Sequence, residues 1–83
     1  MRMSPSKSKI LRQAILGSYP SSQNIPEKIT INDVTAKWPF LKSTGLTAYT
    51  VLQYANTEDE SQLSDSLMTI FMDSLNVYNE YHS

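Results

Sequence analysis

The sequence lacks cysteine and contains a single histidine, and both features narrow the chemistry open to this chain. Without cysteine there is no disulfide or thiolate metal site, and we expect an intracellular location, in the cytoplasm or nucleus. The one histidine, His82, is one residue from the C-terminus, where chains commonly fray. The two glycines, Gly17 and Gly45, form no phosphate-binding loop. The sequence therefore predicts a protein that is not an enzyme and holds no cofactor or metal ion.

Long hydrophobic runs are also missing. The longest uncharged stretch, Ser43 to Thr57, is short and contains many polar residues, so it cannot span a bilayer. The N-terminus shows no continuous apolar segment typical of a secretory signal. Residues 1–24 combine basic residues with many serines and no acid, a composition shared by mitochondrial transit peptides and by basic helices. We favour a basic first helix of the domain, and we expect no membrane partner.

Positive charge is absent from the second half of the chain. All seven Lys and Arg residues lie between Arg2 and Lys42, against two acids, which gives a net charge of +5 for that half. From Ser43 onward, six acids and no Lys or Arg give −6. Such asymmetry indicates either a polar partner or two halves that pack together and neutralise each other. We favour neutralisation, because neither half contains a run of five like charges.

The length of 83 residues predicts one domain, 1–83, with a thin core. Apolar residues make up 40% of the chain, which is enough for a globular core. We expect residues 1–5 and 80–83 to fray. Prolines, serines and an asparagine predict a loop over residues 18–29.

Two helices are predicted in the basic half. The first spans Ser4 to Leu16, with Ser4 or Ser6 as N-cap and an apolar face that includes Leu11 and Ile15. The second is short, Ile31 to Lys37, with Thr30 as N-cap and Asp33 in a capping-box position. Pro39 should end that helix, because a residue before proline is biased away from helical geometry.

Two further segments complete the predicted fold. Leu46 to Ala55 fits an apolar helical stripe, made of Leu46, Tyr49, Leu52 and Ala55, but also contains strand-favouring residues. We favour helix because few partner strands are available. Thr57 and Glu60 form a capping box before an amphipathic helix of about 20 residues that runs to Tyr78. The apolar stripe expected to face the core is Leu63, Leu67, Ile70, Phe71, Leu75 and Tyr78. The fold class is therefore all-α, a small bundle of three to four short helices with a long C-terminal amphipathic helix.

The aromatic residues are most simply core side chains, because a domain of this size needs their buried area. Some of them, and the methionine pair, could instead anchor a protein partner. The candidate partner-binding residues are Trp38, Phe40, Leu41, Met68 and Met72.

The segment Asp33 to Leu41, with its Trp38-Pro39-Phe40-Leu41 motif, resembles a region of uncharacterised vertebrate proteins related to sterile-alpha-motif-containing proteins. This resemblance implies an interaction module without enzyme activity. We expect a non-catalytic protein–protein interaction or assembly module that binds a protein partner or forms a homo-oligomer. The alternative is a small helical nucleic-acid-binding domain, in which Lys7, Lys9 and Arg12 contact phosphates.

Overall fold

The structure, a computed structural model, describes residues 6–17 and 26–82, with side chains described as far as Asn76. These residues form five α-helices and two 3-10 turns, and none of them lies in a strand. In chain order the elements are α1 (Lys7–Leu16), α2 (Ile31–Ala36), α3 (Trp38–Leu41), η2 (Lys42–Thr44), α4 (Ala48–Ala55), η3 (Glu60–Gln62) and α5 (Asp65–His82). The predicted all-α fold with a long C-terminal helix is confirmed.

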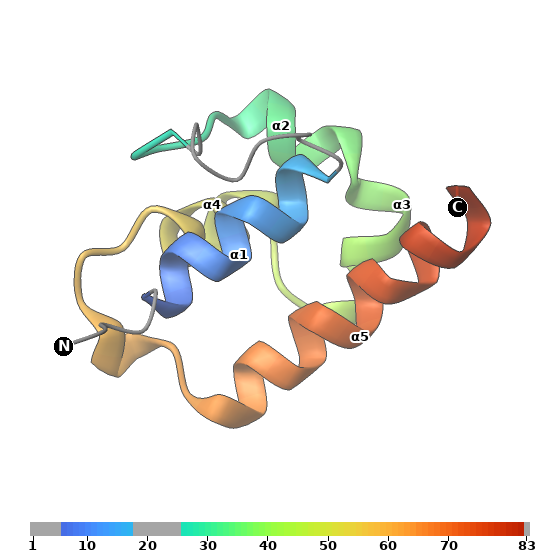
Figure 1. Cartoon of the computed structure of the whole chain (residues 1–83). Coiled ribbons are helices and arrows are strands. Elements are labelled where there is room, and N and C mark those ends of the chain that lie inside the picture. Colours follow the sequence, from blue (N-terminus) through green and yellow to red (C-terminus); the bar gives the residue numbers. More distant parts are fainter. Residues whose placement is uncertain (1–5, 18–25, 83) are drawn as a thin grey trace, which may run out of the picture.

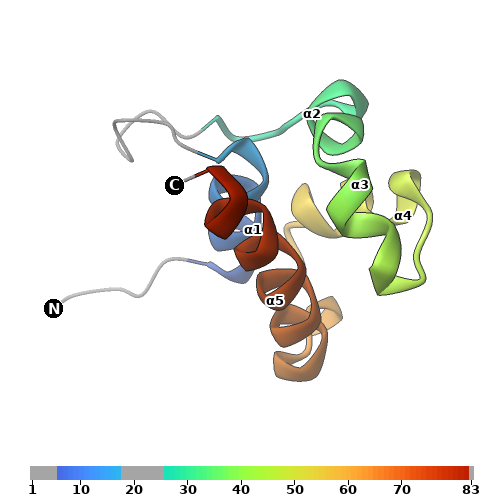
Figure 2. The ribbon, with the colours of Figure 1, turned by 90° about the vertical axis from the view of Figure 1, so that its right-hand side faces the viewer.

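The helices pack around α5 and α1. Helix α5 contacts α1 along one side and α3 along the other, while α4 packs against α1 and α2. Figure 1 shows α4 behind α1, and α5 running diagonally from η3 towards α3. Figure 2, turned by 90°, shows α5 and α1 on one side of the molecule and α2, α3 and α4 on the other. The start of α5 therefore lies far from α2.

Each of the five helices contributes at least one apolar side chain to one shared core. Phe71 of α5 is fully buried, and its ring lies 6.2 Å from the ring of Tyr54 on α4. Burial of large apolar side chains is the main favourable term in folding, and α3 adds to this core through Leu41. The core residues are Leu11, Ile15, Ile29, Val34, Leu41, Val51, Ala55, Leu63, Phe71 and Leu75.

Local sequence signals mark both the start and the end of helix α1. The Ser6 hydroxyl accepts a hydrogen bond from the Lys9 backbone N–H at 3.1 Å, which makes Ser6 the N-cap. The other predicted cap, Ser4, lies outside the described residues. Gly17 ends the helix with a φ of 77°, a left-handed value that L side chains rarely adopt. Residues 26–29 after it have no regular structure, as predicted, and residues 18–25 are outside the description.

The region around Pro39 corrects a prediction. Thr30 and Asp33 form the expected capping box of α2, which ends at Ala36. After a turn at Lys37, however, a second helix, α3, begins at Trp38. Pro39 is tolerated there because the first turn of a helix needs no backbone donor. The turn at Lys37 thus separates two short helices, and Pro39 lies in the first turn of the second one.

Helix α4 (Ala48–Ala55) confirms the choice of helix over strand, although it begins two residues after the predicted start at Leu46. Thr47 caps it by accepting from the Thr50 backbone N–H at 3.1 Å. The predicted apolar stripe included Tyr49 and was wrong at that position. The buried residues are Val51 and Ala55, whereas Tyr49 is 70% exposed. Tyr49 lies on the solvent side because the core contacts the opposite side of the helix.

The predicted start of the C-terminal helix at Thr57 is also wrong. The Thr57 hydroxyl accepts from the Asp59 backbone N–H at 3.0 Å, and the Asp59 carboxylate accepts from the Ser61 backbone N–H at 3.0 Å. Such local side-chain bonds compete with helix formation. Helix α5 begins only at Asp65, where the Ser64 hydroxyl accepts from the Leu67 backbone N–H at 3.1 Å.

Helix α5 differs from the predicted helix in where it ends and in which of its residues are buried. Its backbone remains helical to His82, beyond the point where we expected fraying. Ile70, a predicted core residue, is 44% exposed, whereas Phe71 and Leu75 are buried. The side chain of Tyr78 lies outside the described part. Within residues 6–17 and 26–82, no helix combines the length and the apolar character needed to cross a bilayer.

Candidate functional site

An uncharged surface on α4 is the first candidate site. Tyr49 is the most exposed large apolar side chain among the described residues. Gln53, one turn further along, is also exposed and shares its side of the helix. The hydroxyls of Thr47 and Thr50 lie 2.8 Å apart at the start of the same helix. We call these four residues, Thr47, Tyr49, Thr50 and Gln53, the Tyr49 surface.

The chain on both sides of the Tyr49 surface also lacks charge, because residues 43–57 include no Asp, Glu, Lys or Arg. The cores of protein interfaces are depleted in charged residues and enriched in aromatic ones such as tyrosine. The Tyr49 surface therefore has the composition of an interface core. A second exposed apolar residue, Ile70, lies on α5 one turn before Ser74, whose hydroxyl is 3.3 Å from that of Ser43.

The predicted partner-binding residues differ in their accessibility. Leu41 is fully buried and belongs to the core. Trp38, Met68 and Met72 are partly buried and pack against the core, and Phe40 is also partly buried. The structure brings their helices, α3 and α5, into contact. Leu41 can therefore reach a partner only if the core opens, whereas the other four present part of their surface.

The predicted nucleic-acid-binding residues lie on α1, and two of them make contacts within the chain. The Lys7 ammonium forms a salt bridge with Asp65 at 3.1 Å and donates to the Leu63 carbonyl at 2.8 Å. Arg12 donates from Nε to the Pro26 carbonyl at 3.0 Å and from Nη1 to the Ala55 carbonyl at 2.9 Å. The side chain of Lys9 is exposed. Lys7 and Arg12 thus join α1 to other segments.

Glu60 also joins two distant segments. Its carboxylate accepts from the backbone N–H of Lys7 at 2.9 Å and of Ser8 at 3.4 Å. The first backbone N–H groups of a helix lack partners within the helix and carry partial positive charge, so a carboxylate is favourable there. Glu60 was predicted to cap the C-terminal helix, but it caps α1 instead. Together with the Lys7–Asp65 pair, this contact links the basic and acidic halves.

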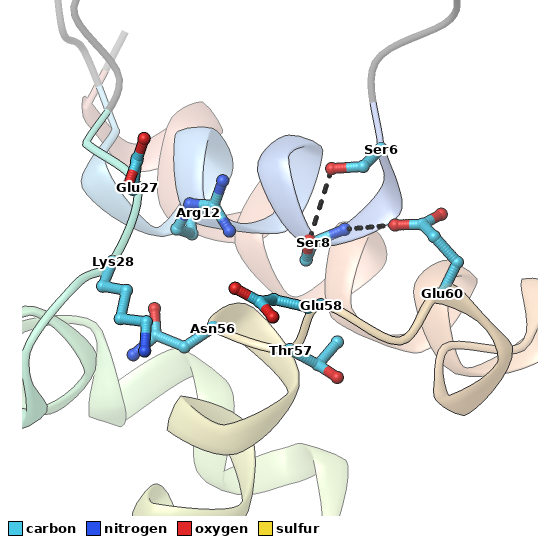
Figure 3. Close-up of a pocket in the computed structure, with 9 residues that line it drawn as sticks. All are labelled: Ser6, Ser8, Arg12, Glu27, Lys28, Asn56, Thr57, Glu58 and Glu60. Carbon is cyan, nitrogen blue, oxygen red and sulfur yellow. Dashed lines mark hydrogen bonds between the residues drawn. The ribbon is translucent and has the colours of Figure 1, made fainter.

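A polar pocket of about 370 Å³ lies beside these contacts. Figure 3 shows side chains from α1 and its N-cap, from residues 27–28 and from residues 56–60 around it. Among the described residues, no three His, Cys, Asp or Glu side chains form a group that could hold a metal ion. The lining residues are Ser6, Ser8, Arg12, Glu27, Lys28, Asn56, Thr57, Glu58 and Glu60.

Asn56 joins two of the segments that border this pocket. Its Oδ1 accepts from the Ile29 backbone N–H at 2.8 Å, and its Nδ2 donates to the Ile29 carbonyl at 2.9 Å. Arg12 donates to carbonyls on both sides of the same junction, those of Pro26 and Ala55. These two side chains therefore replace secondary structure as the link between residues 26–29 and the end of α4.

The turn before η3 lowers the pKa of one carboxyl group near the pocket, that of Asp59. The Ser61 hydroxyl donates to Asp59 Oδ1 at 2.6 Å, and the Ser61 backbone N–H donates to the same oxygen at 3.0 Å. These hydrogen bonds favour the charged form and hold the pKa of Asp59 below its ordinary value of 3.8. Asp59 is therefore ionised at neutral pH and stabilises the turn.

Sequence reasoning missed Tyr49 and Asn56. The uncharged stretch that contains Tyr49 was visible, but its helical pattern placed Tyr49 in the core. No local signal marks Asn56, because its partner is 27 residues away. Comparison with protein-family models, curated proteins and solved structures finds no match for this chain. The resemblance of residues 33–41 to proteins related to sterile-alpha-motif-containing proteins stays a prediction from sequence.

Proposed function

We propose that this chain is a non-catalytic protein–protein interaction or assembly module, and that the Tyr49 surface is its contact surface. The observation that carries this proposal is the 70% exposure of Tyr49 in the middle of an uncharged stretch. An aromatic ring exposed to water is unfavourable in the free protein. Burial of that ring by a partner is therefore favourable. Tyrosine is also among the residues most often found at the centres of interfaces.

Several polar residues that could suggest catalysis or nucleic-acid binding make contacts within the chain, and these contacts support a role in stabilising the fold. Arg12 and Asn56, which line the pocket, bond to backbone groups of the same chain. Lys7 is engaged by Asp65 and Leu63. A phosphate-binding face on α1 would have to draw on cations that already hold the fold together. The interaction module therefore has more support than the nucleic-acid-binding domain.

Site-specific photo-crosslinking in the cells that express the protein tests this proposal. A photoreactive residue replaces Gln53, which is exposed on the Tyr49 surface. The matched control places the same residue at Gln13, an exposed glutamine of α1. We expect discrete protein crosslinks from position 53 that are absent from position 13 and lost when Tyr49→Ser is added. Equal labelling from both positions, or no labelling from position 53, would contradict the proposal.

A further inference from the structure

The segment from Thr57 to Glu60 carries more negative charge than the fold uses. Thr57 is followed by three acids in succession, and no other serine or threonine of the chain has more than one acid among the three residues after it. Asp59 and Glu60 accept hydrogen bonds, from Ser61 and from the start of α1. Glu58 has no side-chain hydrogen bond or ion pair with another described residue. The charge of Glu58 is therefore available to a molecule outside the chain.

The same segment lies at the surface, in a connection without helical structure. Residues 56–59 join α4 to η3, and the three acids of the segment are exposed. The Thr57 hydroxyl accepts from the Asp59 backbone N–H at 3.0 Å and donates to the Asp59 carbonyl at 3.4 Å. Figure 3 shows Thr57 and Glu58 on this connection at the edge of the polar pocket. Both contacts of the hydroxyl are local and exposed, so it can be released without opening the core.

We infer that Thr57 is a phosphorylation site for a protein kinase that recognises acids on the C-terminal side of its acceptor hydroxyl. This inference does not rest on the proposed function. Recognition of this kind depends on charge complementarity, in which basic groups of the kinase meet acids of the substrate. Three exposed acids after one hydroxyl supply that charge, and the non-helical connection presents the hydroxyl beside them.

The covalent step transfers the terminal phosphoryl group of ATP to Thr57 Oγ1. The bond between the γ-phosphorus and the oxygen that bridges it to the β-phosphate breaks, a bond between that phosphorus and Oγ1 forms, and ADP leaves. The hydroxyl proton passes to a basic group of the kinase. The kinase and ATP supply every other reactant, so the chain contributes only the acceptor hydroxyl and the acids that position it.

The phosphate changes the charge beside a contact that joins the two halves of the chain. A phosphorylated threonine carries about −2 at neutral pH, so the charge of residues 57–60 changes from −3 to about −5. Glu60, within this segment, accepts from the backbone N–H groups of Lys7 and Ser8 at the start of α1. Like charges held close together repel each other. Phosphorylation of Thr57 therefore loosens the contact between Glu60 and α1.

Incubation of the purified, folded chain with MgATP and an acid-directed serine/threonine kinase tests the inference, with mass spectrometry to locate the phosphate. We expect phosphate at Thr57, which Thr57→Ala abolishes and Thr57→Ser retains. Glu58→Gln should slow the reaction about threefold, because it removes one recognition charge. The matched control is Glu27→Gln, which removes another exposed glutamate that lines the same pocket and should leave the rate unchanged.

The opposite results overturn the inference. A chain without phosphate, or with phosphate only at other hydroxyls, overturns the site at Thr57. Equal rates for Glu58→Gln and Glu27→Gln overturn recognition through the acids. The NMR signals of the Lys7 and Ser8 amides should move on phosphorylation towards their positions in Glu60→Gln, in which the same contact is weakened. Signals that stay at their positions in the unmodified chain would overturn the loosening of α1.

Discussion

Asn56 provides a sharp test of how this small fold is held together. Its side chain makes two hydrogen bonds to the backbone of Ile29, which is only 5% exposed. Asn56→Ala removes both bonds and leaves a buried N–H and a buried C=O without these partners. A typical hydrogen bond contributes about 0.5–1.5 kcal/mol, and an unsatisfied buried group costs more. We expect a loss of about 2–3 kcal/mol in the free energy of unfolding.

That loss is large for this protein. A chain of 83 residues has a free energy of unfolding of about 4–12 kcal/mol. The melting temperature should fall by about 10–20 °C, given about 4–8 °C per kcal/mol for a domain of this size. Urea unfolding followed by the fluorescence of Trp38, the single tryptophan, measures the change directly. Asn32→Ala, at an exposed position of α2, is the control and should cost less than about 0.5 kcal/mol.

The variant Asn56→Asp adds a pH signature. The carboxylate can still accept from the Ile29 N–H, but it faces the Ile29 carbonyl without a proton to donate. The pKa of the new carboxyl should therefore be raised in the folded state. A raised pKa destabilises the fold at neutral pH, and this penalty disappears as the pH falls through the unfolded value of about 3.9. The difference in the free energy of unfolding between Asn56→Asp and wild type should therefore become smaller as the pH falls from neutral to below about 3.9.

The reasoning about Asn56 fails if Asn56→Ala costs no more than Asn32→Ala. It also fails if the difference between Asn56→Asp and wild type is independent of pH. Either result would mean that water or another group satisfies Ile29 at no cost, and that residues 26–29 are held by other contacts.

Two other predictions concern the core and the turn before η3. Phe71→Ala should cost about 3–5 kcal/mol, because Phe71 is fully buried, and Trp38→Ala should cost clearly less, because Trp38 is only partly buried. Urea unfolding followed by circular dichroism compares them, and an equal or reversed order would refute this reading of the core. The Asp59 carboxyl should titrate below 3.8 in an NMR experiment, and Ser61→Ala should move the midpoint upward. Because the pKa of Asp59 is lowered in the folded state, the turn adds stability above pH 3.8 that is lost as the pH falls through the folded-state pKa. A titration midpoint that is unchanged by Ser61→Ala would contradict this.

Local signals in the sequence determined most of the secondary structure. The caps Ser6 and Thr30 and the positive-φ residue Gly17 act on their immediate neighbours, so their effect can be read from the chain alone. The all-α class follows from the apolar spacing of the same segments. The partner-binding and nucleic-acid-binding roles of the candidate residues stay predictions, although the structure shows that Leu41 is buried in the core.

Tertiary structure decided which side of each helix is buried and where distant polar groups meet. Tyr49 and Val51 both fit an apolar helix, and only the positions of α1 and α2 against α4 leave Tyr49 exposed and Val51 buried. Glu60 has the spacing of a local cap, but its carboxylate instead accepts hydrogen bonds from backbone N–H groups at the start of α1, more than 50 residues away. Periodicity and caps describe only near neighbours along the chain. The choice between two compatible sides, or between a near and a distant donor, depends on the packing of the whole fold.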